Sequence, residues 1–222
     1  MQTMVVRSKI TQTFLNPFLS SGGPVTNPWN TRFDRDEYVY GTEPNAFLLQ
    51  SFKQIPNGRV LCLGEGEGRN AVFLAEQGYE VVAVDASNVG LDKAQRLAET
   101  RGVQIETRVA DLTDYDLGQE QWQGIVSIFC HLPPELRQSV HARIAPALAP
   151  QGSLLLEGYT PDQLAHGTGG PPSVEMLYHP AMLQQDFANL TINWLEAKVR
   201  DVTEGIGHTG TGAVVQLIAR KI

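Results

Sequence analysis

The clearest chemistry in the sequence comes from three glycines at alternate positions and a carboxylate that follows them. Gly64, Gly66 and Gly68 come directly after the apolar run 60–63, and Asp85 ends a second apolar run over residues 81–84. Glycines let a backbone turn approach a ligand closely, and a carboxylate at this place can accept hydrogen bonds from both hydroxyls of a ribose. The alternative role for Asp85 is an N-cap for the following helix. The pattern therefore predicts a nucleoside-binding turn between two strands.

The same turn distinguishes two kinds of nucleotide-like cofactor. A nicotinamide enzyme needs G-x-G-x-x-G, whose third glycine allows close packing of helix on strand, but Arg69 stands at that third position. Glu65 and Glu67 add negative charge where a diphosphate would lie, which is repulsive. A cofactor with a positive sulfonium and no phosphate avoids this penalty. The turn therefore favours S-adenosylmethionine over a dinucleotide.

Further candidates follow the next two predicted strands. Asp111 could accept a hydrogen bond from an adenine amino group, and Leu112 with its neighbouring backbone could cover the adenine ring. Phe129 and Cys130 lie at the carboxyl edge where open α/β sheets bind ligands, so their backbone is expected to line the methionine part of the cofactor. His131 stands beside the predicted reacting carbon and could act as a base or orient an anion. A structural or exposed histidine is the alternative.

An aromatic segment precedes the first predicted strand. Arg32 lies between Trp29 and Phe33 and could bind an anionic substrate or the cofactor carboxylate. The alternatives are a surface salt bridge for Arg32 and core anchors for the two aromatic residues. The π faces of four aromatic residues could also meet the sulfonium, namely Trp29, Tyr38, Tyr40 and Tyr178.

The elements that position these residues alternate between strand and helix. Strands are expected over residues 59–63, 80–84, 103–109, 124–129 and 152–158, and helices over 69–77, 89–101 and 135–148. Such alternation is typical of a parallel sheet covered by helices on both faces. After Tyr159 we expect a lid-like loop over 160–180, a short helix near 180–187, and strand-like runs 190–202 and 213–221 that are joined as a hairpin by 205–212. The predicted fold is α/β, a seven-stranded, mostly parallel, doubly wound sheet with a C-terminal antiparallel hairpin.

The composition and net charge of the chain restrict the kinds of molecule that it is expected to bind. The net charge of −7 disfavours a large nucleic-acid substrate. The histidines and cysteines lack metal-ligand spacing, so no metal is expected. No apolar run reaches the ~20 residues of a membrane span, and residues 1–21 do not read as a signal peptide. We therefore expect a cytoplasmic protein with a small-molecule substrate and no membrane partner, and the sequence does not indicate an oligomeric state.

These motifs together resemble the Rossmann-like S-adenosylmethionine-dependent methyltransferases over about residues 40–222, with residues 1–39 as an N-terminal arm and cap segment. More narrowly, stretches 63–70 and 84–87 look like the tellurite-resistance methyltransferases and their thiopurine-methyltransferase-like relatives, which carry Arg-Asn after the glycine turn. The Trp29-x-x-Arg32-Phe33 segment is similar to one that lies over the cofactor in thiopurine methyltransferases. The chain departs from the family at Glu65, where Cys, Ser or Thr is usual, and matches only loosely after Tyr159.

The resemblance implies methyl transfer from S-adenosylmethionine to a small, soft anionic acceptor such as a thiol, tellurite or selenite. His131 and Arg32 are the candidate catalytic residues. A catalytically silent S-adenosylmethionine-binding protein and a nicotinamide-dependent oxidoreductase are the alternatives. The expected cofactor-binding residues are Trp29, Arg32, Tyr40, Gly64, Glu65, Gly66, Gly68, Asn70, Asp85, Ala86, Ser87, Asp111, Leu112, Phe129 and Cys130.

Overall fold

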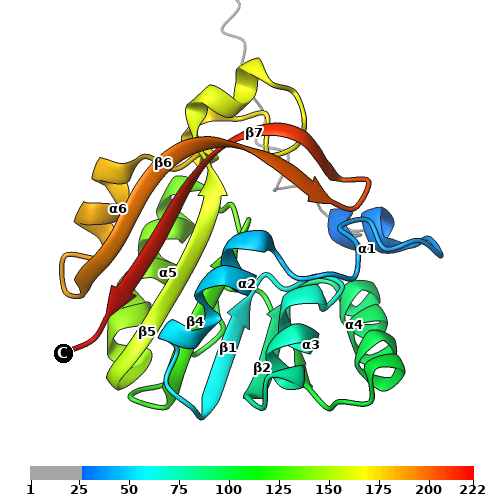
Figure 1. The fold of residues 1–222 in the computed structure, drawn as a ribbon, viewed down its shortest axis with the longest axis horizontal. Helices are drawn as coiled ribbons and strands as arrows, with labels where there is room; N and C mark the ends of the chain where they lie inside the picture. The colour runs from blue at the N-terminus through cyan, green and yellow to red at the C-terminus, as the bar shows by residue number, and fades with distance from the viewer. Residues whose placement is uncertain (1–26) are drawn as a thin grey trace, which may run out of the picture.

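One seven-stranded sheet organises the computed structural model, which describes residues 27–222 (Figure 1). The strand order is β3-β2-β1-β4-β5-β7-β6. Strands β1 to β5 pair in parallel, and β7 is antiparallel to both of its neighbours. The predicted α/β fold class is therefore confirmed. The expectations about residues 1–26, which are the first part of the N-terminal arm and the absence of a signal peptide, concern residues that the structure does not describe.

The elements follow the expected alternation closely. The strands are β1 (Arg59–Leu63), β2 (Glu80–Asp85), β3 (Glu106–Val109), β4 (Trp122–Ile128), β5 (Leu148–Tyr159), β6 (Thr191–Glu204) and β7 (His208–Arg220). The α-helices are α1 (Pro28–Phe33), α2 (Ala46–Ser51), α3 (Arg69–Glu76), α4 (Asn88–Arg101), α5 (Pro134–Ala147) and α6 (Pro180–Asp186). Short 3₁₀ turns η1 (Phe52–Gln54), η2 (Pro161–Ala165) and η3 (Val174–Met176) complete the described chain.

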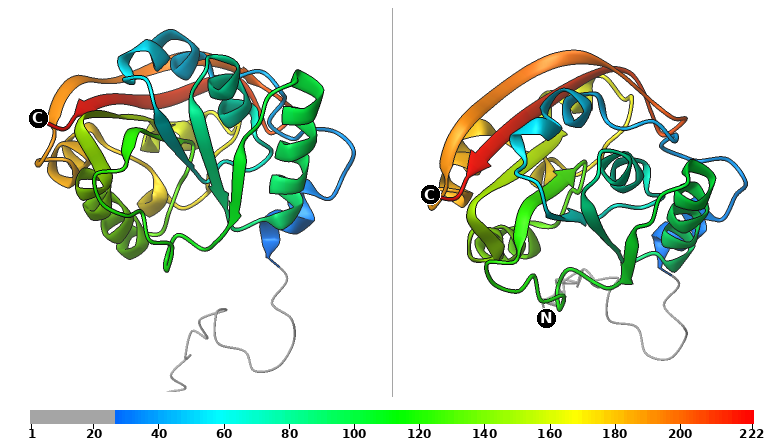
Figure 2. Two further views of the ribbon diagram at one scale, coloured as in Figure 1. Left: turned by 90° about the horizontal axis from the view of Figure 1, so that it is seen from below. Right: turned by 60° about the horizontal axis from the view of Figure 1, so that its bottom comes forward.

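Helices cover both faces of the sheet (Figure 2). Alternate residues of β1 face opposite sides, because successive strand side chains point in opposite directions. Val60 and Cys62 pack in the cluster that contains the buried residues of α2, α3 and α4. Leu61 and Leu63 pack in the cluster that contains those of α5 and α6. The continuous apolar runs of the central strands are thus explained by burial on both faces.

Three predicted boundaries were wrong. Strand β5 begins at Leu148 and not at Gly152, and the other two differences have a local reason. Strand β3 begins at Glu106 and not at Val103, because the Val103 amide donates to the Ala98 carbonyl and belongs to the C-terminal cap of α4. The hairpin connection is shorter than expected, since residues 208–212 pair with β6 as part of β7. At Gly212 a Cβ atom would lie 2.9 Å from Val202, so this glycine permits close packing and does not form a turn.

The hairpin carries the C-terminal part of the chain to the N-terminal cap segment. Strands β6 and β7 arch across the fold toward α1 (Figure 1). The Gly207 amide at the hairpin tip donates to the Val39 carbonyl at 2.8 Å. A Cβ atom on Gly205 would lie only 2.3 Å from the Gly41 amide nitrogen. The described cap residues therefore pack against the domain, and a boundary between residues 39 and 40 stays a prediction.

Candidate active site

The glycine turn joins β1 to α3 at the carboxyl edge of the sheet. Gly64, Gly66 and Gly68 have φ angles of 59°, 64° and 92°, which residues with a side chain rarely adopt. A Cβ atom on Gly64 would lie 2.7 Å from the Cys130 sulfur, so the ends of β1 and β4 meet here. Cys130 is buried, which raises the pKa of its thiol to about 12. Cys130 therefore packs against the turn as a neutral thiol.

Asp85 lies directly beside this turn. Its Oδ2 accepts from the Gly66 amide at 2.9 Å, and its Oδ1 accepts from the Ser87 amide at 2.8 Å. Burial raises the pKa of the carboxyl group, and the two amide hydrogen bonds oppose that rise. Each carboxylate oxygen can accept about two hydrogen bonds, so each keeps capacity for a ligand hydroxyl. The residues fit a ribose-bearing cofactor, and Ser87, which accepts from the Gly90 amide, is the N-cap of α4 in place of Asp85.

Glu65 contacts the N-terminus of α3. Its Oε1 accepts from the Asn70 and Ala71 amides at 2.9 and 2.8 Å, so its carboxylate caps the N-terminus of α3. Burial raises the pKa of this carboxyl group to about 7, against the lowering effect of the two amides and of Arg69. Glu65 thus places a carboxylate where a diphosphate would lie, as predicted. It occupies the helix N-terminus where a diphosphate would bind, and the turn remains unsuited to a dinucleotide.

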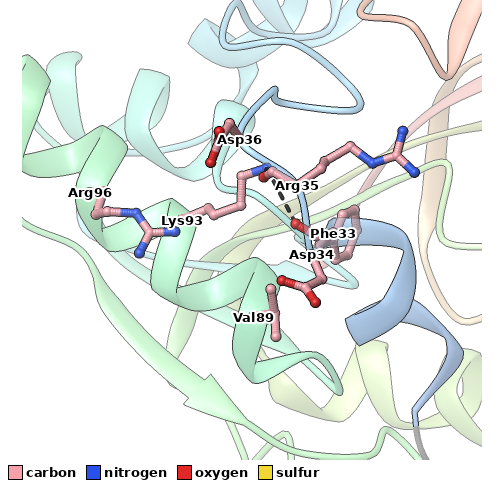
Figure 3. Close-up of a pocket in the computed structure, with 7 residues that line it drawn as sticks. All are labelled: Phe33, Asp34, Arg35, Asp36, Val89, Lys93 and Arg96. Carbon is pink, nitrogen blue, oxygen red and sulfur yellow. Dashed lines mark hydrogen bonds between the residues drawn. The ribbon is translucent and has the colours of Figure 1, made fainter.

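Glu67 is paired within the protein. Its Oε1 lies 2.5 Å from the buried Lys93 ammonium group, and its Oε2 accepts from the Tyr40 amide at 3.2 Å. Lys93 also donates to the carbonyls of Phe33, Arg35 and Glu37, at 3.5, 3.0 and 2.7 Å. Figure 3 shows Lys93 extending from α4 to this segment, where it lines a small surface pocket. The Glu67 charge is therefore compensated, and the pair fixes the cap segment to the glycine turn.

The cap segment places aromatic side chains around the turn. Phe33 is buried, and its ring would lie 3.1 Å from a Cβ atom on Gly66. Trp29 stacks on Phe33 with 5.7 Å between ring centroids. The exposed Arg32 guanidinium lies 5.9 Å from the Trp29 ring centroid and 5.4 Å from that of Tyr40. Within residues 27–222 no carboxylate forms an ion pair with Arg32, so its charge is free to meet a ligand.

The other predicted cofactor residues are at the expected edge, but several are engaged in structural contacts. The Asn70 side chain accepts from the Asn45 amide at 2.9 Å, and the Ala86 carbonyl accepts from the Asn27 side chain at 2.6 Å. Asp111 is exposed after β3, and its hydrogen bonds with Thr113 lower the pKa of its carboxyl group. Leu112 is buried nearby. Asp111 and Leu112 therefore remain available for the adenine contacts proposed for them.

His131 lies close to the end of β4 but has no free ring nitrogen. Its Nδ1–H donates to the Met176 carbonyl at 2.9 Å, and its Nε2 accepts from the Tyr159 amide at 3.1 Å. This pairing fixes one neutral tautomer, because a carbonyl can only accept and an amide can only donate. Burial lowers the pKa of His131 to about 4. The geometry thus disfavours a general base here, and we propose that His131 positions the β4 and β5 ends.

We expect this burial of His131 to make the fold sensitive to acid. The unfolded state binds a proton with a pKa near 6.5, whereas the folded state does so only near 4. Stability is therefore present above pH 6.5 and falls as the pH is lowered toward 4. His131→Gln should reduce that fall by up to about 3 kcal/mol. Urea unfolding at several pH values measures it.

The exposed His179 provides the matched control for this experiment. His179→Gln removes an exposed imidazole by the same substitution, so its unfolding free energies are the reference for those of His131→Gln. An unchanged slope in His131→Gln would show that His131 is not the group that titrates.

Sequence reasoning missed a buried polar network under the hairpin. Arg69 lies 2.6 Å from Glu204, and Arg200 lies 2.8 Å from Glu157 and 2.9 Å from Glu204. Tyr159 and His208 lie beside this network, and Tyr159 ends β5 next to the β4 end. The rule that singled out Phe129, a strand end at the carboxyl edge, could also have found Tyr159. His208 gave no such signal, because its position depends on the hairpin pairing.

Part of the chain that carries this site is similar to a known protein family. Residues 60–152 match the family described as methyltransferase domain. This segment is therefore similar to a methyltransferase domain. The similarity agrees with the S-adenosylmethionine site that the glycine turn and Asp85 predicted. The matched residues run from β1 to the start of β5 and include the glycine turn and Asp85, whereas the cap segment and the hairpin lie outside them.

The chain is also similar to curated methyltransferases and to solved structures. A 2-heptyl-1-hydroxyquinolin-4(1H)-one methyltransferase from Mycobacteroides abscessus is 30% identical over 51% of the chain and 52% of the relative. A tRNA 5-carboxymethoxyuridine methyltransferase from Escherichia coli is 31% identical over 61% of the chain and 55% of the relative. The chain thus spans about half the length of these relatives. TehB from Haemophilus influenzae has the same fold, with a TM-score of 0.64, 21% identity, and coverage of 79% and 61% of the two chains.

Membrane-spanning helices and metal-binding groups are two other features relevant to function. None of the helices within residues 27–222 is long and apolar enough to cross a membrane. The same part of the chain holds no group of three or more His, Cys, Asp or Glu side chains arranged to bind a metal ion.

Proposed function

We propose that the chain transfers a methyl group from S-adenosylmethionine to a small acceptor. The observation that carries this proposal is the pairing of an open glycine turn with a buried carboxylate, Asp85, that retains capacity to accept hydrogen bonds. The bound cofactor supplies a methyl group on a positively charged sulfonium. The protein's contribution is to hold the ribose through Asp85 and to exclude water with the aromatic residues of the cap segment.

Arg32 supplies the charge that suits an anionic acceptor or the cofactor carboxylate. Its guanidinium lies against two aromatic rings, which hold its plane while leaving its N–H groups exposed. His131 has both nitrogens occupied, so the site offers no base at that position. An acceptor that is already ionised needs none. We therefore propose a small, soft anion of the thiol, tellurite or selenite type, in keeping with the narrower resemblance to tellurite-resistance methyltransferases.

A small acceptor is favoured over tRNA, although one relative is named for a tRNA nucleoside. The net charge of −7 opposes binding of a polyanion. We expect the protein to act on small molecules in the cytoplasm and without a nucleic-acid or membrane partner.

The test is to incubate the full chain with methyl-labelled S-adenosylmethionine and a panel of acceptors. The panel contains thiols, selenite, tellurite, hydroxylated aromatic compounds and bulk tRNA. We expect label in at least one small acceptor and none in tRNA. Labelled tRNA alone would contradict the small-acceptor proposal. Cofactor binding with no transfer to any acceptor would favour a catalytically silent binding protein.

A further inference from the structure

Three buried polar side chains beside the end of β4 have hydrogen-bonding atoms without a partner. Tyr159 is 0% exposed, and Arg69 and His208 are each 6% exposed. Within residues 27–222, Tyr159 Oη, Arg69 Nη1 and His208 Nδ1 have no hydrogen-bond partner. Buried polar groups are almost always paired, because leaving one unpaired is costly. Three such atoms in one region therefore require an explanation.

These three side chains lie together. The Tyr159 and His208 rings are 5.4 Å apart and nearly perpendicular, and each ring lies within 4.6 Å of the Phe129 ring. Arg69 is the first residue of α3, directly after the glycine turn. Its charge lies close enough to act on the pKa of both Tyr159 and His208. The unpaired atoms are thus grouped between the glycine turn and the end of β4, where a methyl acceptor must bind.

Most neighbouring polar atoms of the described residues have partners within the protein. The exception is Glu204 Oε2, which forms no hydrogen bond but lies 2.6 Å from Arg69 Nη2 as an ion pair. Glu157 accepts from Arg200, Gln216 and Asn45, with distances of 2.5 to 2.8 Å. Glu204 accepts from Asn45 and Arg200 and pairs with the other terminal nitrogen of Arg69. The protein satisfies this network internally and leaves Tyr159, Arg69 and His208 for another molecule.

The surroundings of the three atoms indicate the shape of that molecule. Aromatic rings pack around His208. The centroids of the Tyr40 and Phe129 rings lie 4.5 and 4.6 Å from the centroid of the His208 ring. The backbone at Gly169 and Gly170 passes against Tyr159, since a Cβ atom on either glycine would lie 3.1 Å or less from it. Part of the loop between β5 and α6 thus covers this region as a lid. Aromatic rings around the three atoms, covered by this loop, favour an aromatic ligand that can pack against them.

We propose that Arg69, Tyr159 and His208 form the acceptor subsite, and that the acceptor is a flat, apolar ring carrying an acidic hydroxyl or its oxyanion. Arg69 can only donate a hydrogen bond, and Tyr159 can donate or accept. The neutral imidazole of His208 accepts from a hydroxyl in one tautomer and donates to an oxyanion in the other. This inference rests on the proposed methyl transfer, and it replaces the thiol, tellurite or selenite type of acceptor with one recognised through oxygen.

The test compares Tyr159→Phe and His208→Phe with the wild type, using three probes in the presence of S-adenosylhomocysteine. The probes are 2-naphthol, naphthalene-2-thiol, which has the ring without the oxygen, and selenite, which has the oxygen without the ring. We expect the wild type to bind 2-naphthol more tightly than the other two probes. Each variant should raise the dissociation constant for 2-naphthol about tenfold, which is the usual contribution of one hydrogen bond. Affinity for the cofactor product should not change.

Stability separates a binding role from a structural one. The Tyr159 hydroxyl has no partner within the described chain, so Tyr159→Phe should leave the melting temperature unchanged or raise it. Tyr79 is the matched control, because its hydroxyl donates to the Ile55 carbonyl at 2.9 Å. Tyr79→Phe should lower the melting temperature and leave 2-naphthol binding unchanged.

Several results would overturn the subsite. These are stronger binding of naphthalene-2-thiol or selenite than of 2-naphthol, or 2-naphthol binding that neither variant weakens. Failure of the wild type to bind S-adenosylmethionine would instead contradict the proposed function itself.

Discussion

Asp85→Asn is expected to weaken S-adenosylmethionine binding by about tenfold to a hundredfold. A hydrogen bond to a charged group contributes roughly 1.5–3 kcal/mol, and the amide cannot replace the carboxylate. One carboxylate oxygen becomes an NH₂ group, which would face either the Gly66 or the Ser87 amide donor. The change therefore removes a ribose acceptor and loosens the turn that must lie beside it. Isothermal titration calorimetry measures the loss.

Asp114→Asn is the control for charge, because Asp114 is an exposed aspartate on the loop that follows β3. It should bind the cofactor as the wild type does. Equal cofactor affinity in Asp85→Asn and the wild type would show that Asp85 does not bind the ribose.

Gly68→Ala is expected to destabilise the fold by about 2–5 kcal/mol. A left-handed backbone costs a non-glycine residue about 1–2 kcal/mol, and overpacking adds about 1–3 kcal/mol. Gly68 has a φ of 92°, and its added Cβ atom would lie 2.5 Å from the Ala94 Cβ and 2.7 Å from the Ala94 Cα. Because Ala94 belongs to α4, the helix cannot move away without separating α3 from α4.

Gly78 offers a control with the same backbone conformation. Its φ is 91°, and a Cβ atom there would meet nothing within 4 Å. Gly78→Ala should therefore cost only the backbone part, about 1–2 kcal/mol. Urea unfolding of both variants isolates the packing contribution as their difference. If the two alanine variants were equally stable, close contact between α3 and α4 at Gly68 would not be what requires glycine there.

Local patterns in the sequence were enough to predict the glycine turn and the carboxylate of Asp85 beside it. The apolar runs, the alternating glycines and Asp85 all lie within about one strand–helix–strand unit, and the handedness of such units places their ligand edge. The expected helix over 69–77 and strand over 59–63 agree with α3 and β1 within one residue. The kind of cofactor followed from the same short segment.

Partners distant in the sequence could not be predicted in this way. Glu67 was assigned to the ligand side of the turn, but Lys93 neutralises it from α4. His131 was a candidate base or anion-orienting residue, but the Met176 carbonyl and the Tyr159 amide occupy its nitrogens. Both results depend on tertiary packing, which a pattern of residue types does not encode.

The acceptor side depends on packing even more strongly. Tyr159 and His208 lie outside the segment that matches the methyltransferase family, and they meet only because β7 pairs with β5. Glycines 205 to 212 suggested a turn, but Gly210 and Gly212 lie within β7 and pair with β6. The identity of the acceptor therefore depends on the packing of the β6–β7 hairpin and of the loop between β5 and α6.

The central claim is that the turn from Gly64 to Gly68, with Asp85 beside it and Glu65 on the α3 N-terminus, holds S-adenosylmethionine and no dinucleotide. Calorimetric titration of the full chain with S-adenosylmethionine and, separately, with NAD and NADP tests this most directly. We predict saturable binding of S-adenosylmethionine with one site per chain and no measurable heat with either dinucleotide. Tight binding of a dinucleotide together with no binding of S-adenosylmethionine would contradict the account.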